Sequence, residues 1–321
     1  MSLDLLLENL SNPTLLFFFL GLLAVNLKSD LEIPANSSKF ISIYLLFSIG
    51  FKGGQELAHS TWGMGIVWAS MFGILLALAV PVYTFFILKK RVGVLNAGAI
   101  AASYGSVSAV TFITTISFLD LQNIEYGSHM VGVMALMEAP AILIGVLLIC
   151  FFKSSEGDNI SIRSIVNHSL TNGSVLLILG SLVIGLVASE SQANGIKPFT
   201  TDIFTGFLAI FLLDMGIESG RRISGLWKNG WFPFIFAVVI PLFNGSMIAL
   251  TSGFFIDNPG DQLLFAILTA SASYIAVPAS MKIAVPQANP GLYIPMAIAI
   301  TFPFNITLGI PFYYYLILTV G

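Results

Sequence analysis

Long runs of apolar residues constrain this chain more than any other feature of its sequence. A helix needs about 20 mainly apolar residues to cross the hydrocarbon core of a bilayer. Of the 321 residues, 56% are hydrophobic and only 9% are charged, whereas soluble domains carry about 25% charged residues. Ten apolar runs can be distinguished, at residues 13–28, 40–51, 62–88, 93–119, 126–152, 173–189, 201–216, 230–256, 261–285 and 291–319. The sequence therefore predicts an all-α membrane protein with ten transmembrane helices and no sizeable soluble domain.

The basic residues are distributed unevenly between these runs. With the N-terminus placed outside, alternate connections carry Lys28, Lys39, Lys89, Lys90, Arg91, Lys153, Arg163, Arg221, Arg222, Lys228 and Lys282. The opposite side carries only Lys52 and Lys197. Because cytoplasmic loops of membrane proteins are enriched in Lys and Arg, we expect a multi-pass protein with both termini outside.

The chain contains an internal repeat. Residues 45–57 (LLFSIGFKGGQEL) resemble residues 211–223 (FLLDMGIESGRRI), and the Ser-Val-Ser at 106–108 matches the Ser-Ala-Ser at 271–273 at nearly the same offset. Five spans in each half leave the second copy upside down, which is the 5+5 inverted repeat of many secondary transporters. We divide the chain into a first five-helix repeat (1–152), a cytoplasmic linker (153–172) and a second, inverted five-helix repeat (173–321).

The fourth and ninth spans are interrupted near their middles by Gly, Ser and Pro. Such an interruption leaves backbone polar groups that hydrocarbon cannot satisfy, so it is tolerated only inside the protein or beside a water-filled cavity. We therefore expect helices 4 and 9 to be discontinuous, with their inner N-terminal ends facing each other and binding a small anion. The expected substrate-binding residues are Gly105, Ser106, Val107, Ser108, Ala270, Ser271, Ala272 and Ser273. Alternatively, these small residues only allow close packing of helices.

Oxygen atoms near the same interruptions suit a sodium ion. The expected ligands are released carbonyl groups together with Ser103, Thr111 and an acidic residue. Glu138 is the candidate acid, because an ionisable group deep in an apolar run costs about 2.5–3.5 kcal/mol on insertion scales and is functional by default. Alternatively, Glu138 is a structural carboxyl group next to Pro140.

The remaining charged residues do not suggest a further site, and the sequence argues against several other classes of function. We interpret Asp214, Glu218, Lys52 and Glu56 as interfacial charges at the ends of the second and seventh helices. The net charge of −3 and the scattered basic residues argue against binding to nucleic acid. The single cysteine, the absence of clustered His residues and the lack of a nucleophile–base pair argue against a transition-metal site, a further cofactor and an enzyme.

The chain resembles the SbtA-type sodium-dependent bicarbonate transporters of cyanobacteria and other bacteria. The resemblance rests on IGFKGGQEL (49–57), SYGSVSAVTF (103–112), MEAPAIL (137–143), LDMGIESG (213–220), SASYIAVPAS (271–280) and VPQANPGLYI (285–294). It implies a homotrimer in the cell inner (plasma) membrane that imports bicarbonate with sodium, and a PII-like regulatory protein that docks on the cytoplasmic face. Relatives carry an acidic residue at the place of Tyr274, and we include Tyr274 among the expected sodium-binding residues.

Two classes of function are compatible with these features. The first is a sodium-driven symporter for bicarbonate, or for another small monovalent organic anion, which works by alternating access. The second is an anion channel or carrier without ion coupling, in which Glu138 is structural. Dependence of accumulation on a sodium gradient distinguishes the two.

Overall fold

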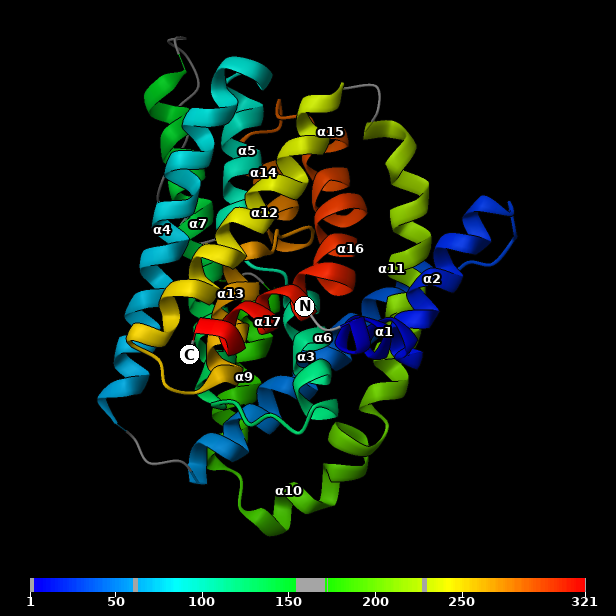
Figure 1. Cartoon of the computed structure of the whole chain (residues 1–321), viewed down its shortest axis with the longest axis vertical. Coiled ribbons are helices and arrows are strands. Elements are labelled where there is room, and N and C mark those ends of the chain that lie inside the picture. Colours follow the sequence, from blue (N-terminus) through cyan, green and yellow to red (C-terminus); the bar gives the residue numbers. More distant parts are fainter. Residues whose placement is uncertain (1–2, 60–62, 154–170, 172, 227–229, 321) are drawn as a thin grey trace.

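The computed structural model describes residues 3–59, 63–153, 171, 173–226 and 230–320, and every regular element within them is a helix. Figure 1 shows the longer helices side by side in a bundle. Of the linker expected at 153–172, only Lys153 and Thr171 are described, so this part of the prediction lies almost wholly outside the described residues.

The described residues of the first half, 3–59 and 63–152, form seven helices. They are α1 (Leu3–Ser11), α2 (Pro13–Asn26), α3 (Ala35–His59), α4 (Met64–Val92), α5 (Val94–Gly105), α6 (Ala109–Leu121) and α7 (His129–Phe152). The predicted fourth span is thus divided between α5 and α6, as the Gly and Ser residues in its middle indicated.

The second half begins at α9 and ends in a segment of mixed helix types. Its elements are α9 (Gly173–Val187), α10 (Glu190–Lys197), η1 (Pro198–Asp202), α11 (Phe204–Leu226), α12 (Trp231–Thr251), η3 (Ser252–Phe254), α13 (Pro259–Ala270), α14 (Ala276–Ala284), α15 (Pro290–Pro295), η4 (Met296–Thr301), α16 (Phe302–Phe304), η5 (Asn305–Gly309) and α17 (Ile310–Val320). The predicted ninth span is divided between α13 and α14. Elements η1, η4 and η5 are π-helical, a form that occurs mostly as short insertions and often near functional sites.

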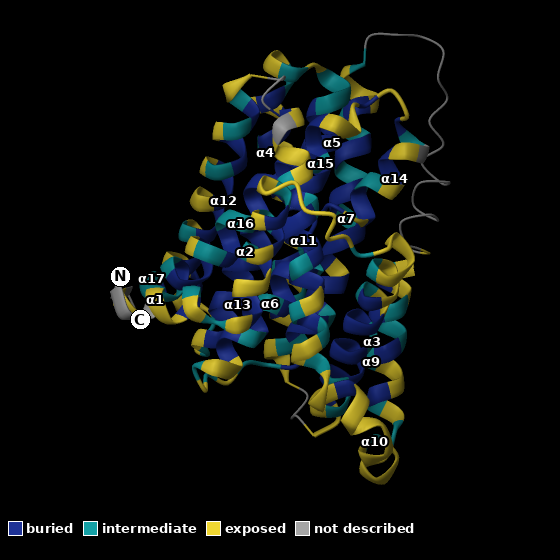
Figure 2. Ribbon diagram, turned by 90° about the vertical axis from the view of Figure 1, so that its right-hand side faces the viewer, coloured by how far each residue is buried: buried dark blue, intermediate teal, exposed yellow. Residues whose placement is uncertain are grey.

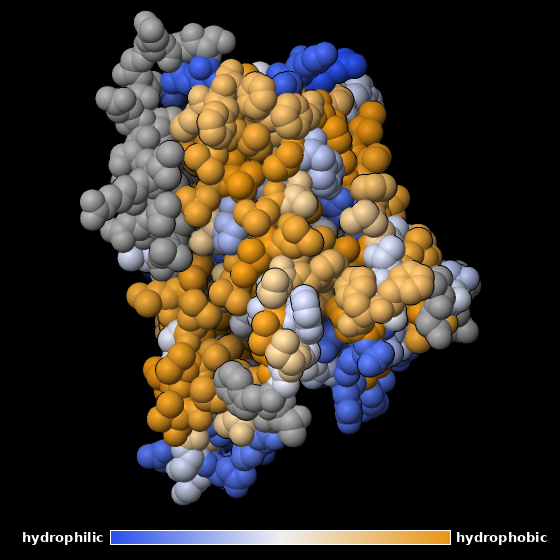
Figure 3. All heavy atoms as spheres, turned by 90° about the vertical axis from the view of Figure 1, so that its left-hand side faces the viewer, coloured by the Kyte–Doolittle hydropathy of each residue, from blue (hydrophilic) through white to orange (hydrophobic). Residues whose placement is uncertain are grey.

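Six segments of the described chain are long and apolar enough to cross a membrane. They are Met64–Val92, Val94–Leu121, His129–Phe152, Glu190–Ile223, Trp231–Phe254 and Pro290–Thr319. The other predicted spans coincide with α2 and α9, which are apolar but only 14 and 15 residues long, with the more polar α3, and with the divided pair α13–α14. The chain is therefore an all-helical, multi-pass membrane protein. Figure 3 shows the corresponding apolar belt between hydrophilic ends.

Three helices begin at an Asn-Pro dipeptide. In each case the Asn side chain accepts a hydrogen bond from a backbone N–H in the first turn, at 2.8–2.9 Å, and Pro occupies a position that needs no N–H donor. The dipeptides are Asn12-Pro13 before α2, Asn258-Pro259 before α13 and Asn289-Pro290 before α15. This local chemistry fixes where α13, one of the divided helices, begins.

Glycines allow two pairs of helices to approach closely: α2 packs against α11, and α3 packs against α9. A Cβ atom on Gly54 of α3 would lie 2.1 Å from the Leu182 carbonyl oxygen and 2.9 Å from the Cα atom of Gly185. A Cβ atom on Gly21 of α2 would lie 2.2 Å from the Leu213 carbonyl oxygen. Backbones that touch in this way are typical of membrane helix interfaces.

Replacing Gly54 with alanine should force α3 and α9 apart. We expect the free energy of unfolding to fall by about 1–3 kcal/mol, the usual cost of overpacking, seen as a lower melting temperature of the purified protein in detergent. Gly180 of α9 is the matched control, because nothing lies within 4 Å of a Cβ atom placed there. Equal melting temperatures for G54A and G180A would contradict this account of the crossing.

The divided helices lie at the centre of the bundle. In the segment that contains α5 and α6, 89% of the most apolar stretch is buried, compared with 44% in α4 and in the α12 segment. Figure 2 shows α13 and α6 dark with burial, whereas α10 at the bottom is exposed. Protein rather than lipid therefore surrounds the irregular backbone, which is the condition for tolerating it at membrane depth.

Candidate functional site: two divided helices around one cavity

The first break separates α5 from α6. Helix α5 ends at Gly105, where a Cβ atom would lie 2.1 Å from the ring carbon Cγ of Pro81. After two non-helical residues, Ser108 caps α6, and its hydroxyl oxygen accepts a hydrogen bond from the Thr111 N–H at 3.2 Å. The break is thus set by a close helix contact on one side and a serine cap on the other.

The second break separates α13 from α14. Helix α13 ends at Ala270, and the Ser271 hydroxyl donates back to the Leu268 carbonyl at 3.0 Å. The Ser273 hydroxyl accepts a hydrogen bond from the Val277 N–H at 3.3 Å, near the start of α14. At the first break, α5 ends at residue 105 and α6 begins at residue 109. At the second break, α13 ends at residue 270 and α14 begins at residue 276.

Hydrogen bonds join the two breaks directly. The Ser108 N–H donates to the Ser271 hydroxyl oxygen at 2.9 Å, and the Ser273 N–H donates to the Ser103 carbonyl at 2.8 Å. All four residues are buried, with at most 4% of their surface exposed. The predicted discontinuities are therefore present, and they lie against each other.

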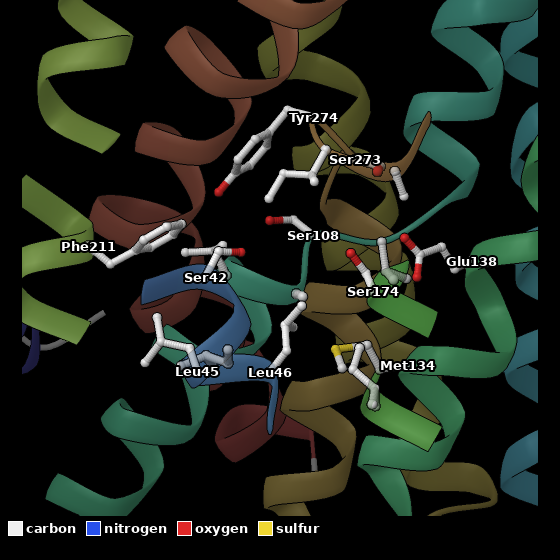
Figure 4. Close-up of a pocket in the computed structure, with 17 residues that line it drawn as sticks. Ser42, Leu45, Leu46, Ser108, Met134, Glu138, Ser174, Phe211, Ser273 and Tyr274 are labelled. Carbon is white, nitrogen blue, oxygen red and sulfur yellow. The ribbon is translucent and has the colours of Figure 1, made fainter. Parts of the chain in front are cut away.

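A small cavity adjoins the junction (Figure 4). Its walls come from α3, α6, α7, α9, α11 and α14 and from the residues at the breaks. Its volume is about 30 Å³, which is room for two or three water molecules, since one water needs about 10–15 Å³. Among the described residues, its polar lining is Ser42, Ser108, Glu138, Ser174, Ser273 and Tyr274. No Lys, Arg or His belongs to this lining.

Backbone N–H groups at the N-terminal ends of α6 and α14 are free of protein partners. Within the described residues, the N–H groups of Ala109, Val110 and Ala276 form no hydrogen bond, and all three residues line the cavity. These residues could not be identified from the sequence, because an apolar side chain does not indicate whether the backbone N–H group of the same residue is free. The inner N-terminal ends of both divided helices thus border one cavity.

Four of the residues singled out from the sequence carry buried hydroxyl groups without a hydrogen-bond partner in the described structure. They are Ser103, Ser106, Thr111 and Tyr274. In Figure 4 the Tyr274 side chain extends into the cavity, and its hydroxyl group lies near the Ser108 side chain. Since more than 90% of buried polar groups find partners, such a concentration calls for an explanation.

Glu138 lies in the wall of the cavity. It is 6% exposed, and no described residue forms an ion pair or hydrogen bond with it. Ser42 of α3 and Ser174 of α9 line the same cavity; neither was singled out from the sequence. In the view of Figure 4, Ser108 lies between Glu138 and Tyr274.

The residues predicted for the site divide into those that line the cavity and those that surround it. Val107, Ser108, Ser273, Glu138 and Tyr274 line it. The others lie in or next to the breaks without belonging to the cavity wall: Ser103, Gly105, Ser106, Thr111, Ala270, Ser271 and Ala272.

Two buried asparagines lie behind the second break. The Asn305 side chain donates to the Ala270 carbonyl at 2.8 Å, and the Asn244 side chain donates to the Thr269 carbonyl at 3.1 Å. Tyr83 donates to the Asn244 side-chain oxygen. The carbonyl groups at the end of α13, which the sequence suggested as sodium ligands, are therefore already hydrogen-bonded.

The interpretation of Asp214 as an interfacial charge is wrong. Asp214 is only 6% exposed, and its carboxylate accepts a hydrogen bond from the Ser38 hydroxyl, which joins α11 to α3. Lys52 and Glu56 form a half-exposed pair, and Glu218 pairs with Arg222 at 2.8 Å. The sequence pattern could not distinguish Asp214 from Glu218, one turn later, because burial depends on the partner helix.

A family model of the Na+-dependent bicarbonate transporter superfamily matches residues 13–318 of the chain. The match thus includes both breaks and every residue of the cavity wall. Comparison with individual curated proteins gives no significant match. Within the described residues, no three His, Cys, Asp or Glu side chains gather into a group that could hold a metal ion.

Proposed function

Because the chain belongs to the Na+-dependent bicarbonate transporter superfamily, we propose that it imports bicarbonate together with sodium through the cavity between its divided helices. Membership of a transporter superfamily also means that the chain is a transporter and not an enzyme. The observation that carries the proposal is the combination, at one cavity, of free N–H groups at two helix ends with unpartnered buried hydroxyl groups.

The anion binds to the N-terminal ends of α6 and α14. Each end presents free N–H groups and the positive pole of a helix dipole, worth about 0.3–1 kcal/mol and up to about 2 kcal/mol when partly buried. The hydroxyl groups of Ser108 and Ser273 border the same space and can reorient toward the anion. A small cavity without a cationic side chain favours a small monovalent anion over a larger or more highly charged one.

Sodium binds to oxygen atoms beside the anion. Na+ is a hard cation that prefers oxygen ligands, and unwound backbone and half-helix ends supply such ligands in other secondary transporters. Glu138 adds a negative charge in the cavity wall, and the unpartnered hydroxyl groups add neutral oxygen atoms. Binding sodium next to the anion offsets the repulsion that Glu138 would otherwise exert on bicarbonate.

Alternating access follows from the arrangement of the cavity walls. Helices α3, α9 and α11 line part of the cavity, and α2 packs on α11 and α3 packs on α9 through glycines. The divided helices line another part of the cavity. We propose a ten-helix, 5+5 inverted repeat of residues 1–152 and 173–321. In this arrangement the divided helices α5, α6, α13 and α14 move against helices α2, α3, α9 and α11. The corresponding positions of the breaks support this repeat, because α5 and α13 end 165 residues apart and α6 and α14 begin 167 residues apart. The inner-membrane orientation with both termini outside, the homotrimer and the PII-like partner belong to the same proposal.

Uptake of labelled bicarbonate into proteoliposomes tests the function. With an inward sodium gradient, we expect accumulation above the external concentration; with equal sodium on both sides, only equilibration is expected. Equal accumulation in both conditions would favour an uncoupled carrier or channel. Unlabelled acetate, nitrate and sulfate serve as competitors, and stronger inhibition by acetate than by unlabelled bicarbonate would identify an organic anion as the substrate.

A further inference from the structure

The two breaks have equivalent positions but unequal chemistry. At an offset of 165 residues, Gly105 at the end of α5 corresponds to Ala270 at the end of α13, and Ser106 corresponds to Ser271. If each break bound a cation in the same way, the equivalent oxygen atoms would be equally accessible. The hydrogen bonds at the two breaks show instead that their oxygen atoms are not equally accessible.

Oxygen atoms at the first break are free. Within the described residues, the carbonyl groups of Tyr104 and Gly105, the last two of α5, accept no hydrogen bond. The hydroxyl groups of Ser103, Ser106 and Thr111, which flank the break on both sides, are buried and have no partner. The C-terminal end of α5 also carries the negative pole of its helix dipole. These oxygen atoms at the first break are therefore not occupied by any donor of the described protein.

Oxygen atoms at the second break are occupied. The two equivalent carbonyl groups, those of Thr269 and Ala270, each accept a hydrogen bond from a buried asparagine amide. The Ser271 hydroxyl both donates to the Leu268 carbonyl and accepts from the Ser108 N–H. An asparagine NH2 group carries partial positive charge, so it takes the place that a cation would fill.

The side-chain sequence shows the same asymmetry. The positions equivalent to Ser103 and Thr111 are Leu268 and Ala276, which have no side-chain oxygen. Tyr274 has an unpartnered hydroxyl group, but that group lies in the cavity near Ser108 and Phe211, not at the end of α13. The second break therefore lacks the free carbonyl groups of the first, and among the positions equivalent to Ser103, Ser106 and Thr111 only Ser271 has a hydroxyl group, which is already hydrogen-bonded.

The asparagines are held in place by their own contacts. Asn305 lies at the start of the π-helical η5, and Tyr313, which donates to the Pro241 carbonyl at 2.9 Å, packs next to it. Asn244 lies on α12 and receives the hydrogen bond from Tyr83. Both asparagines are at most 1% exposed, so their hydrogen bonds to the end of α13 lie in the core of the protein.

We propose that the coupling cation binds at the first break only, on oxygen atoms of the Ser103, Ser106 and Thr111 hydroxyls and of the free α5 carbonyls, while Asn244 and Asn305 replace a second cation at the second break. One sodium ion therefore accompanies each bicarbonate ion, and the transport cycle moves no net charge. This stoichiometry rests on the proposed function, whereas the placement of the cation can be tested without transport.

A sodium titration of thermal stability tests the placement. Purified protein in detergent is titrated with NaCl against choline chloride, without bicarbonate. We expect the S103A/T111V double variant to need at least tenfold more sodium than the wild type for half-maximal stabilisation, with a Hill coefficient near 1 for the wild type. Neither substitution removes a hydrogen bond that the side chain makes in the structure.

The control is S252A, which deletes another buried, unpartnered hydroxyl group far along the chain from both breaks. Unchanged sodium dependence in the double variant would overturn the placement.

A membrane potential tests the stoichiometry. Proteoliposomes with a sodium gradient are clamped at 0 mV or at 100 mV, inside negative, with potassium and valinomycin. One sodium ion per bicarbonate predicts equal accumulation, whereas two sodium ions would raise it on the order of 50-fold at 100 mV. Accumulation that rises with the potential would overturn the one-sodium stoichiometry while leaving sodium-coupled transport intact. Loss of sodium-driven uptake in the wild type would instead contradict the proposed function, and the stability titration would still decide the cation site.

Discussion

Substituting proline for Ala109 is expected to reduce bicarbonate uptake at least tenfold. Ala109 is the first residue of α6, and proline at this position removes one N–H group from the cavity without breaking the helix. The preceding residue, Ser108, already has the extended backbone that proline requires of its neighbour, with φ −101° and ψ 105°. Loss of a hydrogen bond to a charged ligand costs about 1.5–3 kcal/mol, which corresponds to about 10–150-fold in affinity.

Two controls distinguish loss of the N–H group from other effects of A109P. A109V enlarges the side chain but keeps the N–H donor, so it should retain most uptake if the amide matters more than the space. M64P places proline at the equivalent first position of α4, which is exposed and far from the cavity, and should leave uptake unchanged. A bicarbonate KM in A109P equal to that of the wild type would remove α6 from the anion site.

The equivalent change at α14 is a poorer test for a structural reason. Ile275, which precedes Ala276, has φ −117° and ψ −64°, a conformation that a following proline disfavours. A loss of uptake in A276P could therefore come from distortion of the break. The two helix starts are similar in what they present to the cavity but different in the backbone that leads into them.

The breaks themselves could be predicted from the sequence because their cause is local. Gly105 and the neighbouring serines lower helix propensity in the middle of an apolar run, and Ser271 and Ser273 do the same in the second half. The structure confirms that both helices are divided and that the breaks are joined through Ser108 and Ser271. Composition also predicted correctly that the chain is an all-helical membrane protein.

The parts that could not be predicted depend on contacts between distant segments. Asn305 reaches the carbonyl of a residue 35 positions earlier, and nothing in its own neighbourhood marks it as a helix cap. Asp214 is buried because α3 supplies Ser38 beside it. The free N–H groups of Ala109 and Val110 were missed for a different reason: their chemistry belongs to the backbone, which every residue shares.

These differences indicate how the chain divides its tasks. In the proposed function, backbone N–H groups face the anion, where they would recognise charge and size without adding a cationic side chain. Side-chain oxygen atoms surround the first break, where a cation needs several ligands. Asparagine amides close the second break, because carbonyl groups left unpaired in a buried core cost free energy. Glu138 contributes the carboxyl group of the cavity wall, and in the proposed function its charge is the most direct link between the two ions.

Replacing Glu138 with glutamine is expected to raise the sodium concentration for half-maximal bicarbonate uptake at least tenfold. The two side chains have nearly the same shape, so the packing of α7 is preserved and the change removes charge alone. Because an interaction with a charged group is worth about 1.5–3 kcal/mol, the loss corresponds to about 10–150-fold in sodium affinity. The measurement is the initial rate of labelled bicarbonate uptake as a function of external sodium at constant ionic strength.

The matched control is E218Q. Glu218 lies on α11 at the surface and pairs with Arg222, an exposed ion pair of small energetic value, so the sodium dependence should not change. A selective effect of E138Q would mean that the carboxylate interacts with the ion and not merely with the fold. An unaltered sodium response in E138Q, with normal uptake at saturating sodium, would instead mean that Glu138 is uncharged during transport, since a protonated carboxyl group and an amide then differ little. The sodium ion would in that case be bound by the neutral oxygen atoms at the first break alone.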